Sequence, residues 1–173
     1  MIQTDYPLEA ISFLLDGDRL PERYAPLLHH KETLLLSLRR LGCARKSDAE
    51  KLPDADYTRM GLDGALTALF RRFLALYDVK PQKLREVETL SADPDERAAL
   101  WELYHLPGVK RVRAMLYYRA GYRSLADLAE TTVSDVRERT ARAIAEDAPG
   151  CTVPLPKEAR THIFVARAFT MQA

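Results

Sequence analysis

The sequence predicts an all-α fold, built as a multi-helix orthogonal bundle. Its 173 residues include 26 Leu and 23 Ala, against 12 Val and Ile together and 7 Gly, and this composition favours helices over strands. Apolar residues also recur at spacings of three and four along most of the chain, as they do on one face of a helix. Between these stretches stand Gly, Pro and capping residues that start and stop helices. A β-sandwich or barrel is therefore not expected.

Helix signals in the first ninety residues define five segments. Gly42 suits the left-handed position that ends a helix, Ser47 opens a short helix with a capping box, and Pro53 ends that helix. The expected helices lie near residues 7–15, 27–41, 47–52, 62–77 and 81–90.

Helix signals in the second half of the chain are similar. Asp93 followed by Pro94 marks a helix start, Pro107 and Gly108 force a tight reversal, and Ser124 caps a short helix. The expected helices lie near residues 94–103, 109–120, 124–128, 134–146 and 157–171. The last of these contains an Ile-Phe-Val run that also suits a strand.

The predicted elements group into three portions. Residues 1–91 form a helical N-terminal portion, residues 92–146 a second helical portion centred on the reversal, and residues 147–173 a linker with a C-terminal helix. A chain of this length suits one domain of ordinary size, with or without a small appendage.

Charge and cysteine content exclude several classes of protein. The net charge is +1, so the molecule as a whole has no field that attracts nucleic acid or a membrane. Cys43 and Cys151 are the only cysteines and lack metal-ligand spacing, which indicates two reduced thiols. The first residues show no leader pattern, and every apolar run, such as the three leucines at 34–36, is far shorter than a membrane span. We therefore expect a cytoplasmic protein that does not bind membranes.

No segment carries a recognisable catalytic or metal-binding pattern. The chain has no glycine-rich phosphate loop, nucleophile elbow or zinc-binding His-Glu-x-x-His stretch. His29 and His30 are adjacent, and adjacent side chains on a helix diverge by roughly 100°. We therefore expect a non-enzymatic protein with no catalytic residue, no metal site and no cofactor.

One segment departs from the overall charge balance. Residues 103–125 contain no Asp or Glu, so the rest of the chain carries a net charge of −4. The five basic residues of the segment are Lys110, Arg111, Arg113, Arg119 and Arg123. Three of them stand at the start of a predicted helix, where free N–H groups and the helix dipole already favour an anion. The sequence therefore predicts a phosphate site there.

The spacing within this helix predicts which side chains are exposed. Lys110, Arg113 and Tyr117 are spaced by three and four, so they share one face. Val112 and Leu116 are then expected to face inward.

The same segment resembles the helix-hairpin-helix superfamily. Its motif is Leu-Pro-Gly, an apolar residue, Gly, three variable positions and Ala. The matching residues are Leu106, Pro107, Gly108, Val109 and Ala114. Residues 120–129 are also similar to the stretch that follows the motif in such domains, so the resemblance is centred on residues 104–129.

The resemblance implies a DNA-binding protein that contacts phosphates without reading base edges. The residues expected to take part are Gly108, Val109, Lys110, Arg111, Arg113 and Arg119. Lys110 replaces the second glycine of the motif. Glycine there lets the backbone approach a phosphate, whereas lysine would supply a side-chain contact instead.

A protein-protein interaction module is the alternative interpretation. The hairpin would then be a structural or docking unit, and Tyr117, Tyr118 and Tyr122 would be its aromatic anchors. An exposed apolar patch beside the hairpin would favour docking, whereas outward-pointing Lys110 and Arg113 would favour DNA.

Overall fold

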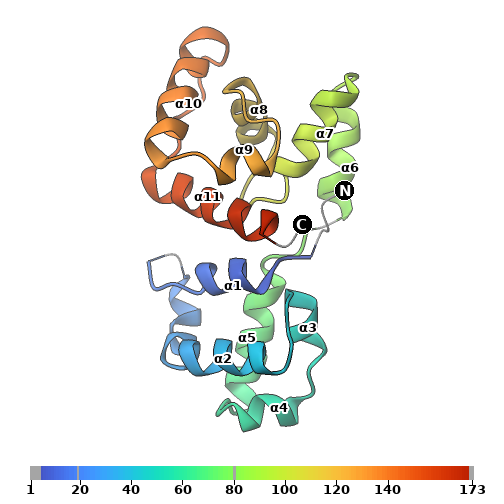
Figure 1. The fold of residues 1–173 in the computed structure, drawn as a ribbon, viewed down its shortest axis with the longest axis vertical. Coiled ribbons are helices and arrows are strands. Elements are labelled where there is room, and N and C mark those ends of the chain that lie inside the picture. Colours follow the sequence, from blue (N-terminus) through green and yellow to red (C-terminus); the bar gives the residue numbers. More distant parts are fainter. Residues whose placement is uncertain (1–4, 19, 80, 172–173) are drawn as a thin grey trace. The chain divides into compact units, whose positions relative to one another are not determined.

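The computed structural model describes residues 5–18, 20–79 and 81–171 of the chain. Within these ranges it contains eleven α-helices, one 3-10 helix and no strand, apart from an isolated β-bridge between Pro7 and Arg45 (Figure 1). The all-α class is therefore confirmed. None of the described helices combines the length and the apolar composition needed to cross a membrane.

The chain divides into two compact units, one up to Asp78 and one from Val79 onward. The boundary expected from the sequence is at residue 91. The division falls earlier because the helix at Pro81–Leu90 packs against the helix at Pro94–Leu103 and so belongs to the C-terminal unit. Residues 147–171 also belong to that unit.

The N-terminal unit has six helices. They are α1 (Leu8–Leu14), η1 (Glu22–His30), α2 (Lys31–Arg40), α3 (Lys46–Lys51), α4 (Asp54–Arg59) and α5 (Gly64–Ala75). Its core is aromatic and leucine-rich, with Phe70, Phe73 and Tyr57 fully buried. The helix expected over residues 27–41 is divided into η1 and α2, and η1 contains Pro26, which has no N–H to donate. The helix α4 was not expected from the sequence.

A capping box stands two residues before its expected place. The helix α3 begins at Lys46, so Ser47 lies inside it rather than at its N-cap. The carboxylate of Asp48 accepts the backbone N–H groups of Ala44 at 3.0 Å and Arg45 at 2.9 Å. A side-chain oxygen thus satisfies N–H groups before the first helical turn, as the sequence predicted, but Asp48 supplies it.

The C-terminal unit also has six helices. They are α6 (Pro81–Leu90), α7 (Pro94–Leu103), α8 (Arg111–Arg119), α9 (Leu125–Ala129), α10 (Val133–Asp147) and α11 (Pro156–Thr170). The side chains of Asp93 and Ser124 cap α7 and α9, as expected. The C-terminal segment that could have been a strand is the helix α11, which packs along α9 and α10 (Figure 1). The helix α8 packs against α7 and α10.

Candidate functional site

The connection between α7 and α8, residues 104–110, is a tight turn with a buried inner side. Leu106 and Val109 are fully buried, and the N–H of Val109 donates to the carbonyl oxygen of Leu106 at 3.2 Å. Gly108 is exposed and has φ of +72°, a conformation that costs an L-residue roughly 1–2 kcal/mol. The turn therefore needs glycine at 108. Val109 anchors the turn by packing, and its N–H is not free for a phosphate.

The start of α8 carries free backbone donors and exposed cations. Lys110 is its N-cap residue, and no side chain caps this end. The first intrahelical bond runs from the N–H of Ala114 to the carbonyl of Lys110 at 2.9 Å, so the N–H groups of the residues between lie in the uncapped first turn. The side chains of Lys110 and Arg111 are exposed. Backbone polarity and side-chain charge at this end both favour an anion.

Two side chains of α8 point in directions that differ from the prediction. Val112 was expected to face inward and is 65% exposed, and Tyr117 was expected to be exposed and is fully buried. The helix begins at Arg111, two residues later than predicted, and packs the positions of Ala114, Leu116 and Tyr117 inward. The exposed face therefore begins with Lys110, Arg111 and Val112.

Arg113 is a structural residue rather than a free cation. Its Nε lies 2.8 Å from Oε1 of Glu158 and its Nη2 donates to Oε2 of the same carboxylate at 3.2 Å. Its Nη1 also donates to the carbonyl of Thr152 at 2.8 Å. The guanidinium thus ties α8 to α11 and to the preceding loop. The sequence predicts that Arg113 offers its charge to a phosphate, and in the structure a half-buried carboxylate neutralises that charge.

Arg119 lies at the other end of α8 from Lys110. The helix has nine residues, and a helix rises by about 1.5 Å per residue, so its ends stand well apart. The Nη1 of Arg119 donates to the carbonyl of Asp147 at 3.4 Å. The structure therefore brings Gly108, Lys110 and Arg111 together and leaves Arg119 in a different place.

A surface pocket of about 510 Å³ lies against the turn. Its lining residues are Glu86, Gly108, Lys110, Arg111, Val112, Arg113, Cys151, Thr152 and Glu158. Among these residues the charges of Arg113 and Glu158 neutralise each other. The remaining charged side chains are the two exposed cations Lys110 and Arg111 and one carboxylate, that of Glu86.

Lys83 of α6 contributes to the positive character of the turn, and no pattern in the sequence pointed to this residue. Burial lowers the pKa of Lys83 to about 8, and the positive charge of Lys110 adds to this shift. The Nζ of Lys83 stands 5.6 Å from the centre of the Tyr104 ring. Since Lys83 and Lys110 are 27 positions apart, only the packing of α6 on α7 brings their charges together.

A buried histidine holds the turn from behind. His162 of α11 lies between the hydroxyl of Tyr117, 2.6 Å from its Nδ1, and the carbonyl of Pro107, 3.0 Å from its Nε2. Burial lowers the pKa of His162 to about 4, so the ring is neutral at pH 7. The Pro107 carbonyl can only accept, so Nε2 carries the hydrogen and Nδ1 accepts the hydroxyl hydrogen of Tyr117. The turn, α8 and α11 are thereby joined at one ring.

The tyrosines named as docking anchors are largely inaccessible. Tyr117 and Tyr122 are fully buried. Tyr118 is half-buried, and the guanidinium of Arg123 covers its ring at 3.9 Å from the centroid. The aromatic anchors expected for a docking surface are therefore absent from this part of the described surface.

Among the described residues, no three His, Cys, Asp or Glu side chains gather in a way that could hold a metal ion. Asp127 caps α9, where its carboxylate accepts the N–H groups of Arg123 at 2.6 Å and Ser124 at 3.0 Å. No protein-family model matches the chain, and neither a curated protein nor a solved structure matches it.

Proposed function

We propose that this chain is a non-enzymatic, largely sequence-nonspecific DNA-binding protein. The turn at residues 106–110 would act as the hairpin of a helix-hairpin-helix unit and would contact backbone phosphates. The carrying observation is the uncapped start of α8, where exposed Lys110 and Arg111 follow a glycine with positive φ. Phosphate contacts at a helix start fix position on the duplex without reading sequence.

The chemistry proposed for Lys110 differs from that of a glycine at this motif position. A glycine would let the backbone approach the phosphate closely. The Lys110 side chain is exposed at the N-cap, so its ammonium reaches the phosphate as a point charge, while the N–H groups of the first turn of α8 donate hydrogen bonds. Arg111 adds a second cation beside it.

Arg113 and His162 support this interface indirectly. The Arg113–Glu158 bridge fixes the first turn of α8 against α11, and the His162–Pro107 bond fixes the turn. A preorganised cation pair loses less conformational entropy on binding than a mobile one. The proposed phosphate contacts are therefore Gly108, Lys110 and Arg111, with Arg113 as a positioning residue.

The test measures DNA affinity by fluorescence anisotropy with a labelled duplex and a single strand of equal length, across a salt series. Two to three phosphate contacts predict a log–log salt slope of about −2 to −3 for the duplex. The double variant Lys110→Glu/Arg111→Glu is expected to lose at least about tenfold in affinity and to flatten the slope.

The matched control is Arg40→Glu/Arg72→Glu, which makes the same change in net charge at two exposed arginines of the N-terminal unit. Circular dichroism checks that both variants are folded. Absence of salt-dependent duplex binding by the native chain, or equal affinity of the two double variants, would overturn the proposal. Docking of another protein through the exposed start of α8 would then be the remaining interpretation.

A further inference from the structure

A second pocket lies at the far end of α8, between the turn that ends this helix and the side of α10. Its volume is about 210 Å³. The lining residues are Arg119, Ala120, Gly121, Arg139, Arg142, Ala143 and Glu146. Three arginines and one carboxylate give the pocket a net charge of +2, and its remaining walls are alanine and glycine.

Two of the three arginines have no carboxylate partner. In the described part of the chain, neither Arg119 nor Arg139 lies within ion-pair distance of an Asp or Glu. Arg142 pairs with Glu138 at 3.2 Å, but both side chains are about two-thirds exposed, and such surface pairs contribute little. An anion entering the pocket would therefore meet guanidinium groups that have no strong ion pair to break.

Arg139 packs against an aromatic ring and occupies the space beside Gly121. Its guanidinium carbon stands 4.8 Å from the centre of the Tyr122 ring. Gly121 has φ of +91°, and a Cβ added there would lie 3.3 Å from Nη2 of Arg139. The missing side chain at Gly121 thus leaves the space that the guanidinium occupies.

The carbonyl end of α8 repels an anion less than an open helix end would. The N–H of Gly121 donates to the carbonyl of Tyr118, and the N–H of Tyr122 donates to that of Tyr117, both at 3.0 Å. This paired arrangement satisfies carbonyl groups of the last turn. The charge of the pocket is then set mainly by its side chains.

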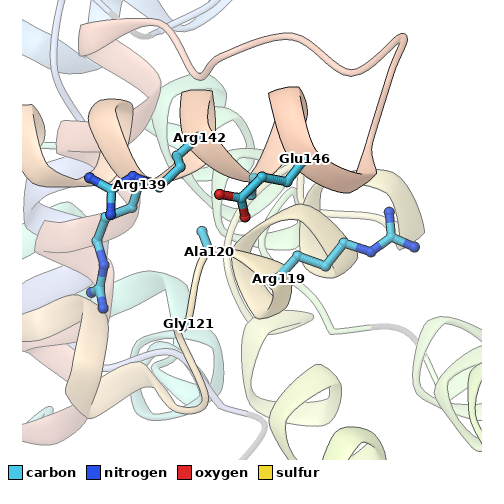
Figure 2. A pocket seen from close by; sticks show the side chains of 7 residues that line it. Arg119, Ala120, Gly121, Arg139, Arg142 and Glu146 are labelled. Carbon is cyan, nitrogen blue, oxygen red and sulfur yellow. The ribbon is translucent and has the colours of Figure 1, made fainter.

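Glu146 is the internal counter-charge of the pocket. Figure 2 shows Arg139 and Arg142 extending to one side and Arg119 to the other, with the Glu146 carboxylate between them. The structure records no ion pair between Glu146 and these arginines. A phosphate entering the pocket would have to compete with this carboxylate, which gives Glu146 an effect opposite in sign to that of the arginines.

The N-terminal unit contains the same kind of turn without a counterpart of Arg139, although Arg40 stands two positions before Gly42 as Arg119 does before Gly121. At Gly42, which has φ of +79°, a Cβ would meet nothing within 4 Å. The N–H of Gly42 donates to the carbonyl of Arg39, and the N–H of Cys43 donates to that of Leu38. Gly121 and Tyr122 make hydrogen bonds of the same spacing after α8. Since the turn forms at Gly42 without a guanidinium against the glycine, the turn itself does not explain the placement of Arg139 beside Gly121.

We propose that the pocket at Gly121 is a phosphate-binding site, separate from the start of α8. It would take one phosphate group, either of a nucleic-acid backbone or of a free phosphorylated molecule. Arg139 would supply a paired hydrogen-bond contact and Arg119 and Arg142 additional charge, since a planar guanidinium matches the oxygen geometry of phosphate. The proposal does not depend on DNA binding by the turn at Gly108.

The test titrates inorganic pyrophosphate into the full chain and follows the backbone amide signals by NMR. The Gly121 and Tyr122 amides are expected to shift in a saturable way. Arg139→Gln is expected to weaken pyrophosphate binding by about tenfold, as loss of a hydrogen bond to a charged group implies. Glu146→Gln is expected to strengthen it, because a competing negative charge is removed.

The matched control is Arg160→Gln, which removes one exposed arginine of α11 outside the pocket lining. This variant should bind pyrophosphate as the native chain does. No saturable shift at Gly121 up to roughly 10 mM, a concentration far above that of a useful phosphate site, would overturn the proposal. Equal affinities for Arg139→Gln and Arg160→Gln would also overturn it.

A second arm identifies the source of the phosphate. A short DNA duplex is added to the pyrophosphate-bound Lys110→Glu/Arg111→Glu variant, in which the start of α8 is disabled. Displacement of pyrophosphate from Gly121 assigns the site to a nucleic-acid backbone, and retention assigns it to a free phosphorylated molecule; both results retain the pocket as a phosphate site. Because the first arm uses Arg139 and no DNA, its failure is distinguishable from failure of the proposed function.

Discussion

Two helix ends in this molecule, one in each unit, share a backbone geometry. The helix α2 ends at Gly42 with φ of +79°, and α8 ends at Gly121 with φ of +91°. In both, the N–H of the next residue donates to a carbonyl five positions back at 3.0 Å, from Cys43 to Leu38 and from Tyr122 to Tyr117. The two helices therefore end in the same backbone turn at a glycine.

The similarity extends into the helices that follow. Asp48 and Asp127 each stand six positions after their glycine, and each carboxylate accepts two N–H groups that precede the next helix. The next helix start is also matched, with Pro53 and Thr132 at the N-caps of α4 and α10. Turn chemistry therefore fixes both segments in the same way.

The two segments differ in the chemistry that surrounds this shared backbone. Before α2 the chain forms η1, which ends in His29 and His30, whereas before α8 it forms the turn at Gly108 followed by Lys110. The Nη2 of Arg139 lies 3.3 Å from the Cβ position of Gly121, whereas nothing lies within 4 Å of that position at Gly42, although Arg40 and Arg119 stand at matching places in the two segments. The backbone turn therefore forms in both units whether or not an arginine lies against its glycine. The placement of Arg139 beside Gly121 requires a separate explanation.

The largest expected difference between the units is their response to acid. Burial lowers the pKa of His162 to about 4 and also lowers the pKa of buried His105, whereas His29 is exposed and His30 half-buried. The unfolded chain therefore takes up the His162 proton first, near pH 6.5. The stability linked to His162 is complete above about pH 6.5 and is lost as pH falls toward 4, by at most about 3 kcal/mol.

Urea unfolding at several pH values, followed by separate NMR signals from each unit, measures this difference. His162→Gln is the control, because the part of the pH dependence that belongs to His162 should disappear in that variant. Parallel loss of stability in the two units, or an unchanged pH dependence in His162→Gln, would contradict the prediction.

Glycine substitution is expected to have a smaller effect and to separate strain from contact. Gly42→Ala and Gly121→Ala each place a Cβ in a left-handed conformation, at a cost of roughly 1–2 kcal/mol. Gly121→Ala also presses on Arg139, whose Nη2 would be 3.3 Å from the new Cβ. We expect both variants to lower the free energy of unfolding of their own unit and only Gly121→Ala to shift the Arg139 Nε–H signal. An unchanged Arg139 signal would show that the contact is not maintained in solution.

The smallest expected effect concerns the ion pair between α8 and α11. If the turn at Gly108 binds DNA, Glu158→Gln should lower duplex affinity a few-fold relative to a matched control, because the bridge that fixes the first turn of α8 against α11 is weakened. The control is Glu88→Gln, which removes one exposed carboxylate of α6 and has the same effect on net charge. Equal affinity of the two variants would show that the Arg113–Glu158 bridge does not position the proposed phosphate contacts.

Local signals allowed much of the helical structure to be predicted from the sequence. Asp93, Ser124 and Gly42 act within a few residues of their own position, and the structure places all three at the expected helix ends. Leu116 is buried as expected, but Val112 was misplaced because the buried face of α8 is made by Ala114, Leu116 and Tyr117, and the local pattern does not show which face the rest of the unit covers. Capping residues therefore predict where a helix begins and ends better than they predict which of its side chains are buried.

Long-range pairs in the candidate site could not be predicted. The partner of Arg113 is Glu158, 45 positions away, and the turn at Pro107 is bonded to His162, 55 positions away. Neither residue carries a local pattern that names its partner, since a single Glu or His on an amphipathic helix is compatible with many neighbours. Counting basic residues along the sequence therefore overestimated the number of unpaired cations at the start of α8.

The bond between Pro107 and His162 also orders the events of chain synthesis. The turn leaves the ribosome 55 residues before the histidine that holds it, which at 5–20 residues per second corresponds to roughly 3–11 s. During that interval Tyr117 lacks its imidazole partner and Arg113 lacks its carboxylate. The N-terminal unit ends at Asp78, so all of it leaves the ribosome before the last helix of the C-terminal unit.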